Sequence, residues 1–338
     1  MTPAIFGTAG AELTADERAF FADASPAGYI LFGRNCVDPE QLRALTNSLR
    51  ELHGRDRLFI CIDQEGGRVA RLRAPQWTNY PAGEAFDRLY SIAPASAIEA
   101  ARSNAEAMGR ELAAMGITVD CHPPLDVRQE GAHDVIGDRA LGRDPRQVAA
   151  LGRAILDGLA RAGIAGCIKH MPGHGRSQCD SHKEMPTITA SEEELEADLA
   201  PFRALANTPI GMTGHLLFTA WDKDNPATFS PFVINEIIRK RIGFDGLLLT
   251  DDIDMEALNG SIADRSQRAL AAGCDLVLNC WAKMDDMIAI ANIAPAIREA
   301  SLDRLERAMN SCLVATEGDR DALLAKRDAL LAIDGAEA

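Results

Sequence analysis

GFDGLLLTDD, residues 243–252, places three consecutive leucines directly before two aspartates. A strand that is buried on both faces is almost entirely apolar, whereas a strand with one solvated face alternates apolar and polar residues. Leu247–Leu249 therefore predict a strand inside a parallel sheet that is covered on both sides. Asp251, at the end of this strand, is then expected at the carboxyl edge of the sheet.

Seven other short apolar runs share this character. They are AIFG (4–7), GYILFG (28–33), RLFICID (57–63), GITVDCH (116–122), AGCIKH (165–170), PIGMTGH (209–215) and DLVLNC (275–280). Between the runs, apolar residues recur every three or four positions, as on one face of a helix, and the segment 191–205 opens with a capping-box pattern. Eight strands, each followed by a helix, predict an α/β fold of the (β/α)8 TIM-barrel type. A doubly wound open sheet is the alternative, although no GxGxxG turn follows the first run.

The domain organisation follows from where these runs end. They occupy about residues 1–285, and about 286–338 are rich in Ala and Leu and are expected to be helical. Since no linker or repeat interrupts the chain, we expect one barrel domain over 1–338 with a C-terminal helical tail. No heptad seam is visible, which favours a monomer over an oligomer.

The charge and the cysteines limit the possible partners and the compartment. The 338 residues include 35 Lys and Arg against 50 Asp and Glu, a formal net charge of −15. Nucleic-acid binding needs clustered cations and is therefore disfavoured. No run approaches the roughly 18 apolar residues of a membrane span, and no export signal is visible. The eight cysteines form no CxxC pair, and we expect them to be reduced in a cytoplasmic protein.

Ionisable residues gather where the predicted strands end. Asp63, His122, His215 and Asp251 are each the last residue of a run, and Lys169–His170 end another. In a parallel barrel these ends meet at one face, which is where barrel enzymes carry their active sites. For any single histidine, a structural hydrogen bond in a half-buried position is the alternative.

Asp251 has two possible roles. A carboxylate fixed above a barrel is a good nucleophile toward the anomeric carbon of a sugar. Alternatively, the aspartates of this segment serve as helix caps, and Asp252 and Asp254 in particular are expected to cap a helix that begins near Met255.

The loop after the fifth run, KHMPGHGRSQCDSHKEMP (169–186), is long for its position. A carboxylate two residues from an imidazole, as in Asp180 and His182, favours the imidazolium and orients the ring for general acid–base chemistry. A surface Asx turn is the alternative. His170, His174, Asp180 and His182 are also of types that bind metals, but their irregular spacing on a glycine-rich loop argues against it, and no metal is predicted.

Together these motifs resemble glycoside hydrolase family 3, and within it the bacterial β-N-acetylglucosaminidases (β-N-acetylhexosaminidases) of peptidoglycan recycling. The most specific segment is KHMPGHG followed by DSH. The others are ILFGRN, DQEGGRV, PPLDV, GRDP, PATFSP and GFDGLLLTDD, so the resemblance covers most of the chain. The chain departs from the family pattern at His122, Leu141 and Met171, which bears on the shape of the sugar subsites.

The resemblance implies a retaining glycosidase without a cofactor. Asp251 would be the nucleophile, and His182, assisted by Asp180, the general acid and base. The implied ligands of the terminal N-acetylglucosamine are Asp63, Arg71, Arg139, Lys169 and His170. The expected substrate is a cell-wall muropeptide, with chitin fragments as an alternative. A β-glucosidase or a phosphorylase on the same scaffold remains an alternative, as does, less favoured, a non-catalytic sugar-binding protein.

Overall fold

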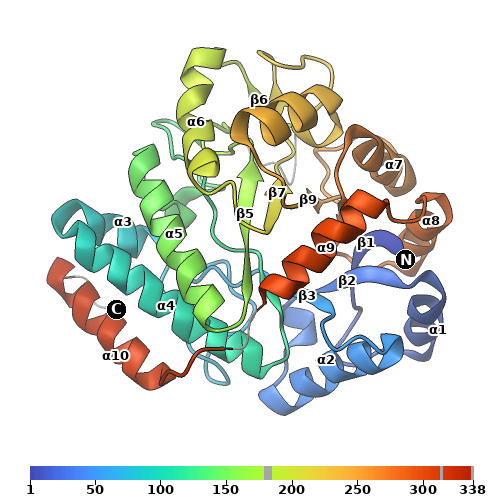
Figure 1. Ribbon diagram of the computed structural model, residues 1–338, viewed down its shortest axis with the longest axis horizontal. Coiled ribbons are helices and arrows are strands. Elements are labelled where there is room, and N and C mark those ends of the chain that lie inside the picture. The colour runs from blue at the N-terminus through green and yellow to red at the C-terminus, as the bar shows by residue number, and fades with distance from the viewer. Residues whose placement is uncertain (179–184, 313–314, 336–338) are drawn as a thin grey trace.

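The computed structural model describes residues 1–178, 185–312 and 315–335, and its centre is a closed barrel of parallel strands (Figure 1). Around the barrel the strands follow the order β1-β10-β9-β7-β5-β4-β3-β2. Their bounds are β1 (Thr2–Gly7), β2 (Pro26–Leu31), β3 (Phe59–Ile62), β4 (Val119–Asp120), β5 (Ala165–Met171), β7 (Ile210–Thr213), β9 (Leu247–Asp252) and β10 (Leu276–Asn279). Every predicted run overlaps one of these strands. The predicted TIM-type barrel is confirmed, and the open-sheet alternative is wrong.

Helices cover the outside of the barrel, with at least one between each strand and the next (Figure 1). They are α1 (Ala15–Ala24), α2 (Pro39–His53), α3 (Gly83–Ile92), α4 (Pro94–Ala114), α5 (Pro145–Arg161), α6 (Glu192–Ala204), η4 (Val233–Ile242), α7 (Ile262–Ala272) and α8 (Met284–Ile293). The predicted capping box of α6 is confirmed, because Ser191 Oγ accepts the backbone N–H of Glu194 and the Glu194 carboxylate accepts that of Ser191.

Short elements complete the chain. The single turns are η1 (Gly33–Asn35), η2 (Gly137–Arg139), η3 (Ala227–Phe229) and η5 (Ala332–Asp334), and β6 (Thr187–Ile188) pairs with β8 (Leu217–Phe218) outside the barrel. None of the helices in the described part of the chain is both long and apolar enough to cross a bilayer.

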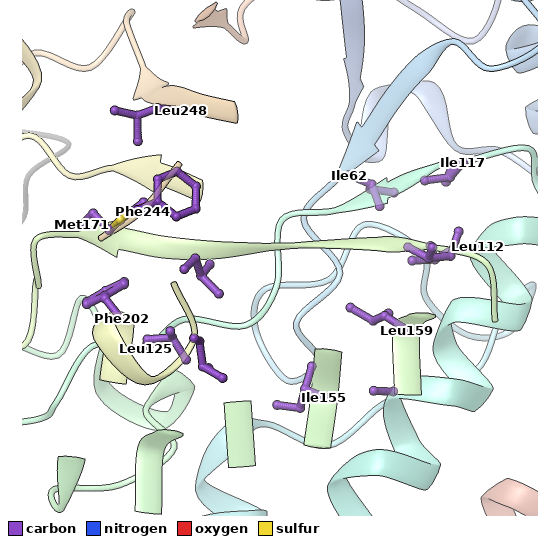
Figure 2. Close-up of a cluster of buried hydrophobic side chains, with 14 of the residues drawn as sticks. Ile62, Leu112, Ile117, Leu125, Ile155, Leu159, Met171, Phe202, Phe244 and Leu248 are labelled. Atoms are coloured by element: carbon purple, nitrogen blue, oxygen red, sulfur yellow. The ribbon is translucent and has the colours of Figure 1, made fainter. Parts of the chain in front are cut away.

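The main apolar core lies between the strands and the surrounding helices. Met171 and Phe244 pack together at one part of it, and Ile155 and Leu159 of α5 lie at another (Figure 2). Met171 and Leu141, two of the three departures from the family pattern, are fully buried members of this core. Their side chains therefore contribute to packing between strands and helices.

A second core fills the inside of the barrel, and α9 (Glu299–Ser311) closes its amino-terminal end. Leu305, Ala308 and Met309 of this helix pack with inward-facing strand residues such as Ile5 and Phe59. Figure 1 shows α9 lying across the strands. The last helix, α10 (Arg320–Leu331), packs instead on the outer surface of α4. We call the end that α9 covers the floor of the barrel and the opposite end its mouth.

The expectation that Asp252 and Asp254 cap a helix near Met255 is wrong, since α7 begins only at Ile262. The Asp254 carboxylate accepts hydrogen bonds from the Asn279 side chain at 2.8 Å and from the backbone N–H of Cys280 at 3.0 Å. These donors lie at the end of the neighbouring strand β10. The carboxylate thus joins two strand ends instead of starting a helix.

Candidate active site

Asp63 follows β3 and begins a loop that Gln64 holds together. The Gln64 amide oxygen accepts the backbone N–H groups of Arg71 (2.8 Å) and Leu72 (3.0 Å), and its amide nitrogen donates to the carbonyl of Leu72 (3.0 Å). These bonds fold the loop back on itself. As a result, the Arg71 guanidinium lies 3.0 Å from Asp63 Oδ2, although eight positions separate the two residues.

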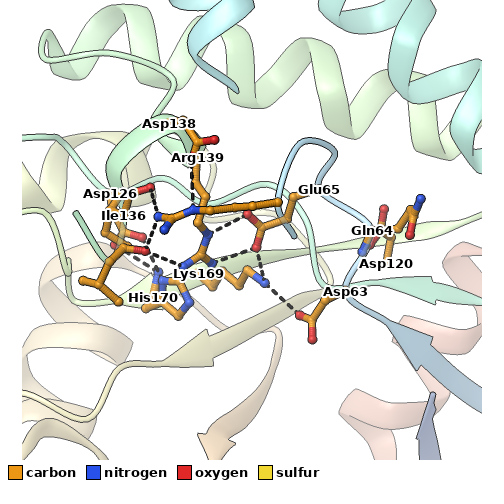
Figure 3. A network of polar contacts seen from close by, with 12 residues as sticks. Asp63, Gln64, Glu65, Asp120, Asp126, Ile136, Asp138, Arg139, Lys169 and His170 are labelled. Carbon is orange, nitrogen blue, oxygen red and sulfur yellow. Dashed lines mark hydrogen bonds and ion pairs between the residues drawn. The ribbon is translucent and has the colours of Figure 1, made fainter. Parts of the chain in front are cut away.

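Lys169 reaches from β5 into the same group of charges (Figure 3). Its Nζ lies 3.0 Å from Asp63 Oδ1 and 2.7 Å from Glu65 Oε1. Both oxygens of Glu65 also bind the Arg139 guanidinium at 2.8 Å, in the two-pronged geometry that planar guanidinium and carboxylate groups favour. Only 2% of the Lys169 side chain is exposed, so this ammonium is buried between two carboxylates.

These contacts keep the network ionised. Burial opposes the charge on Asp63, but Lys169 and Arg71 outweigh that effect and lower the pKa of Asp63 to about 2. Burial also opposes the charge on Glu65, yet Arg139 and Lys169 hold its pKa well below the usual range. In return, the two carboxylates overcome the burial of Lys169 and raise the pKa of its ammonium. At neutral pH the mouth of the barrel therefore presents fixed charges that need no rearrangement to bind a polar ligand.

Asp126 organises the start of the loop after β5. One of its oxygens accepts the backbone N–H groups of His170 (3.2 Å) and His174 (2.7 Å), and the other lies 2.8 Å from His170 Nδ1. Burial opposes its charge, but the two imidazoles and these N–H groups lower the pKa of Asp126 to about 2. An ionised carboxylate can only accept, so Nδ1 of His170 carries a proton. Nε2 is then the nitrogen that remains for a ligand.

Asp251 lies at the end of β9, on the same face of the barrel. Its Oδ1 accepts the backbone N–H of Asp252 at 2.8 Å. Burial favours the neutral acid, but His170, this N–H and Lys169 together lower the pKa of Asp251. The carboxylate is thus ionised at neutral pH, as a nucleophile must be.

His215, two positions after the end of β7, is fully buried and has a structural role. Its Nε2 lies 3.0 Å from the carbonyl oxygen of Asp252, which can only accept, so Nε2 carries the proton. Nδ1 then accepts from the Thr228 hydroxyl at 2.8 Å. Burial lowers the pKa of His215, which keeps the ring neutral. His215 is the structurally satisfied histidine that sequence reasoning left open, and it fixes the backbone beside Asp251.

The structure brings together most of the residues that the sequence singled out. In one connected network, Arg71 and Lys169 pair with Asp63, and Lys169 and Arg139 pair with Glu65. The network holds four of the five expected sugar ligands, and the fifth, His170, directly follows Lys169 (Figure 3). The expected acid–base pair, Asp180 and His182, lies outside the described residues.

Sequence reasoning assigned no role to two residues that organise the site, Glu65 and Asp126. Both lie inside motifs that were recognised, DQEGGRV and PPLDV, a few positions after predicted strands. A carboxylate near the carboxyl end of a barrel strand was the available signal. Their partners lie 74 positions away for Glu65–Arg139 and 44 for Asp126–His170, and spacing along the chain cannot reveal such pairs.

Among residues 1–178, 185–312 and 315–335, no group of three or more His, Cys, Asp or Glu side chains is arranged to hold a metal ion. Two of the four residues considered as ligands from the sequence, Asp180 and His182, do not belong to those ranges.

Known proteins agree with this architecture. Residues 6–311 match the family model described as the glycosyl hydrolase family 3 N terminal domain. A beta-hexosaminidase of Methylococcus capsulatus is 39% identical over 337 residues, 98% of this chain and 97% of the relative, and one of Aromatoleum aromaticum is 40% identical over 287 residues, 82% and 79%. The crystal structure of NagZ from Neisseria gonorrhoeae in complex with N-trifluoroacetyl-D-glucosamine superposes with a TM-score of 0.84 at 32% identity, covering 98% of this chain and 97% of that one.

A TIM barrel whose mouth holds an ionised strand-end aspartate and a dense polar network has the groups that hydrolysis of a sugar linkage requires. The chain belongs to glycosyl hydrolase family 3. It is therefore a glycoside hydrolase, and its predicted resemblance to the bacterial β-N-acetylhexosaminidases of that family is confirmed.

Proposed function

We propose that this enzyme removes terminal β-linked N-acetylglucosamine from saccharides, with net retention, through a covalent glycosyl ester on Asp251. The observation that carries the proposal is the ionised Asp251 carboxylate on the same barrel face as the Asp63–Lys169–Glu65–Arg139 network. The ligand of the similar Neisseria structure, an N-acylated glucosamine, supports the choice of sugar.

The network suits the hydroxyl groups of a terminal sugar. Asp63 can accept hydrogen bonds from neighbouring hydroxyls, while Arg71, Lys169 and Arg139 can donate to ring substituents. His170 adds its Nε2, because Nδ1 is held by Asp126. Since each of these groups is already fixed by a partner, binding requires little reorganisation of the protein.

Two displacements at the anomeric carbon complete the proposed reaction. In the first, an Asp251 oxygen bonds to that carbon while the glycosidic bond breaks, and His182, assisted by Asp180, gives its proton to the departing oxygen. In the second, water gives a proton back to His182 and attacks the same carbon, which releases Asp251 and the sugar. The roles of Asp180 and His182 rest on the family resemblance. An imidazole can replace the usual second carboxylate because it has a pKa near neutral pH.

The expected biological substrate is a muropeptide that ends in N-acetylglucosamine. We place the reaction in the cytoplasm, where the thiols of the seven described cysteines would stay reduced. We also propose that residues 1–338 act as one domain and as a monomer, since the proposed mechanism draws every group from a single barrel.

Product analysis tests the proposal. Wild type should release N-acetylglucosamine as its β anomer from an aryl glycoside and from peptidoglycan fragments, as followed by NMR and mass spectrometry. His182→Ala should lose most activity on substrates with poor leaving groups and less on an activated aryl glycoside.

Three results would contradict the proposal. Initial release of the α anomer would exclude retention. Formation of a sugar 1-phosphate in added phosphate would identify a phosphorylase, and preferential cleavage of aryl β-glucosides would identify a β-glucosidase.

A further inference from the structure

The last helix, α10, lies beyond the part of the chain that the family model matches, which ends at residue 311. It nevertheless packs along α4 and reaches α3 (Figure 1). These two helices follow the loop of residues 63–82, which carries Asp63, Glu65 and Arg71 and which we call the network loop. A segment outside the matched domain therefore contacts both helices that come after this loop.

The end of the network loop packs against its beginning. The backbone N–H of Gly67 donates to the carbonyl oxygen of Tyr80 at 2.8 Å. Gly66, with a φ of +96°, comes so close to the Pro81 carbonyl that no side chain would fit in its place. Because Glu65 directly precedes Gly66, a displacement of Tyr80 would also displace Glu65.

Glu111 of α4 binds the end of the network loop and is itself bound by α10. Its Oε1 accepts the backbone N–H of Thr78 at 3.3 Å and the Thr78 hydroxyl at 3.2 Å. The same oxygen accepts a hydrogen bond from the Arg320 guanidinium at 2.9 Å. The Glu111 side chain is only 6% exposed, so Arg320 supplies a cation to a buried carboxylate. Since a buried carboxylate without a cation is costly, Arg320 stabilises the arrangement in which Glu111 holds Thr78.

A second arginine of α10 contacts the same loop directly. Arg327 is buried, and its Nη1 donates to Asn104 Oδ1 of α4 at 3.1 Å. Its guanidinium carbon lies 5.9 Å from the centroid of the Tyr80 ring, within the range of a cation–π contact. The helix α10 thus acts on the end of the network loop at two places, Thr78 and Tyr80.

We propose that Arg320, acting through Glu111, is a positioning residue for the sugar site, and that α10 supports the network loop in its binding conformation. The inference rests on the proposed function, in which this loop binds the terminal sugar. When the loop is supported, its two carboxylates and its guanidinium are already ordered, so that binding needs little further ordering. Without this support, binding would have to order the loop, and the affinity for the sugar would fall.

Arg320→Ala tests the support from α10. It should weaken the binding of N-acetylglucosamine, followed by ligand-observed NMR, and raise KM for an aryl glycoside, each by about fivefold to tenfold. The proposed nucleophile and acid–base residues lie in other segments, so kcat should change by less than about twofold, as expected for a loss of binding alone. Arg320→Lys keeps the cation and should restore most of the affinity.

Lys326→Ala is the matched control. Lys326 lies on the same helix and pairs with Glu99 of α4, so this substitution removes an ion pair between α10 and α4 that does not involve the network loop. Its KM should equal that of wild type. An unchanged KM in Arg320→Ala, or an equal rise in Lys326→Ala, would overturn the proposal.

Thr78→Val tests the route through Glu111 from the other side. It removes the hydroxyl that Glu111 binds and should also raise KM. Because Arg320→Ala and Thr78→Val act through the same carboxylate, the effect of the double variant should be smaller than the product of the two single effects. Effects that multiply fully would show that Arg320 does not act through Glu111.

Hydrogen exchange keeps this inference separate from the proposed reaction. In the protein without ligand, the amides of residues 64–82 should exchange faster in Arg320→Ala than in wild type or Lys326→Ala, because the loop opens more often. If that difference is found in a protein that does not release N-acetylglucosamine from any substrate, the proposed reaction is wrong and the support of the loop by α10 stands. If the reaction is found but exchange in this segment is unchanged, the proposed role of α10 is wrong.

Discussion

The two ends of the barrel differ in the side chains that form them: charged at the mouth and apolar at the floor. At the mouth, the ionised Lys169 ammonium lies 3.0 Å from Asp63 and 2.7 Å from Glu65, so these charges join strand β5 to the loop after β3. At the floor, Leu305 and Met309 of α9 pack with the inward-facing residues of the strands. The same eight strands support both ends.

This difference separates function from stability. Charges buried at the mouth are tolerated only because each has a partner, and removal of one partner leaves the other uncompensated. Apolar side chains at the floor gain free energy from burial alone and lose it when a cavity forms. Substitutions at the two ends should therefore differ in their effects on activity, stability and pH dependence.

The largest effect is expected at the mouth, from Asp251→Ala. Without the nucleophile, kcat should fall by at least about 10⁴-fold, as is usual for loss of a covalent catalyst. The thermal midpoint should stay close to that of wild type, because within the described structure the carboxylate makes one hydrogen bond, to the Asp252 N–H. Initial rates on an aryl glycoside and calorimetry test this. Substantial residual turnover would assign the nucleophile to another residue.

Lys169→Met should give the largest loss of stability. It leaves Asp63 and Glu65 with one cation fewer in a buried site, at a cost of about 3–5 kcal/mol in the free energy of unfolding. Lys240→Met is the matched control, since its ion pair with Glu236 is exposed and should contribute about 0.5 kcal/mol. Urea denaturation measures both. Equal losses would mean that the buried network stabilises the fold no more than a surface ion pair.

Leu305→Ala tests the floor and should cost about 3 kcal/mol of stability through the cavity it creates. Its kcat/KM should match that of wild type at temperatures where the variant is folded, because α9 covers the end opposite the mouth. Glu306→Ala, on the exposed side of the same helix, should change stability by less than about 0.5 kcal/mol. A loss of activity in folded Leu305→Ala would show that the two ends are coupled.

The smallest effect is a pH dependence that only the mouth should show. Asp63 and Asp126 have pKa values lowered to about 2, so their stabilising contribution is complete above pH 4 and is lost as the pH falls toward 2. Each should contribute about 2 kcal/mol at most. The destabilisation caused by Lys169→Met should shrink over this range, because protonated carboxylates need no cation, whereas that caused by Leu305→Ala should not change. Parallel denaturation curves at pH 3 and pH 6 would reveal either outcome.

Much of the barrel could be predicted because each strand and helix is marked by a pattern within its own short segment of sequence. Each strand is a short apolar run, such as Leu247–Leu249, and each helix has its own period and cap, such as Ser191 for α6. The small pairing of β6 with β8 was not predicted, because strands of two residues leave no periodic pattern. The prediction for Asp254 was wrong because the groups that donate to its carboxylate lie about 25 positions further along the chain. A local pattern cannot reveal such partners, so a helix cap was predicted instead.

The residue types of the candidate site could be predicted from the sequence, but not which of these residues contact one another. The alignment of Lys169 and Asp63 at strand ends follows from the barrel, which brings all carboxyl ends to one face. The pairing of Glu65 with Arg139 depends on how two loops fold toward each other, and no spacing rule encodes that. His215 shows the converse, because a histidine at a strand end turned out to support the backbone next to Asp251.

The position of α9 has a consequence for how the chain is made. Its residues 299–311 are translated after β10, so all eight strands leave the ribosome before the segment that covers their floor. At about 5–20 residues per second, β10 precedes the start of α9 by roughly 1–4 s. During that interval, apolar residues such as Ile5 and Phe59 lack the cover that α9 gives them in the folded chain.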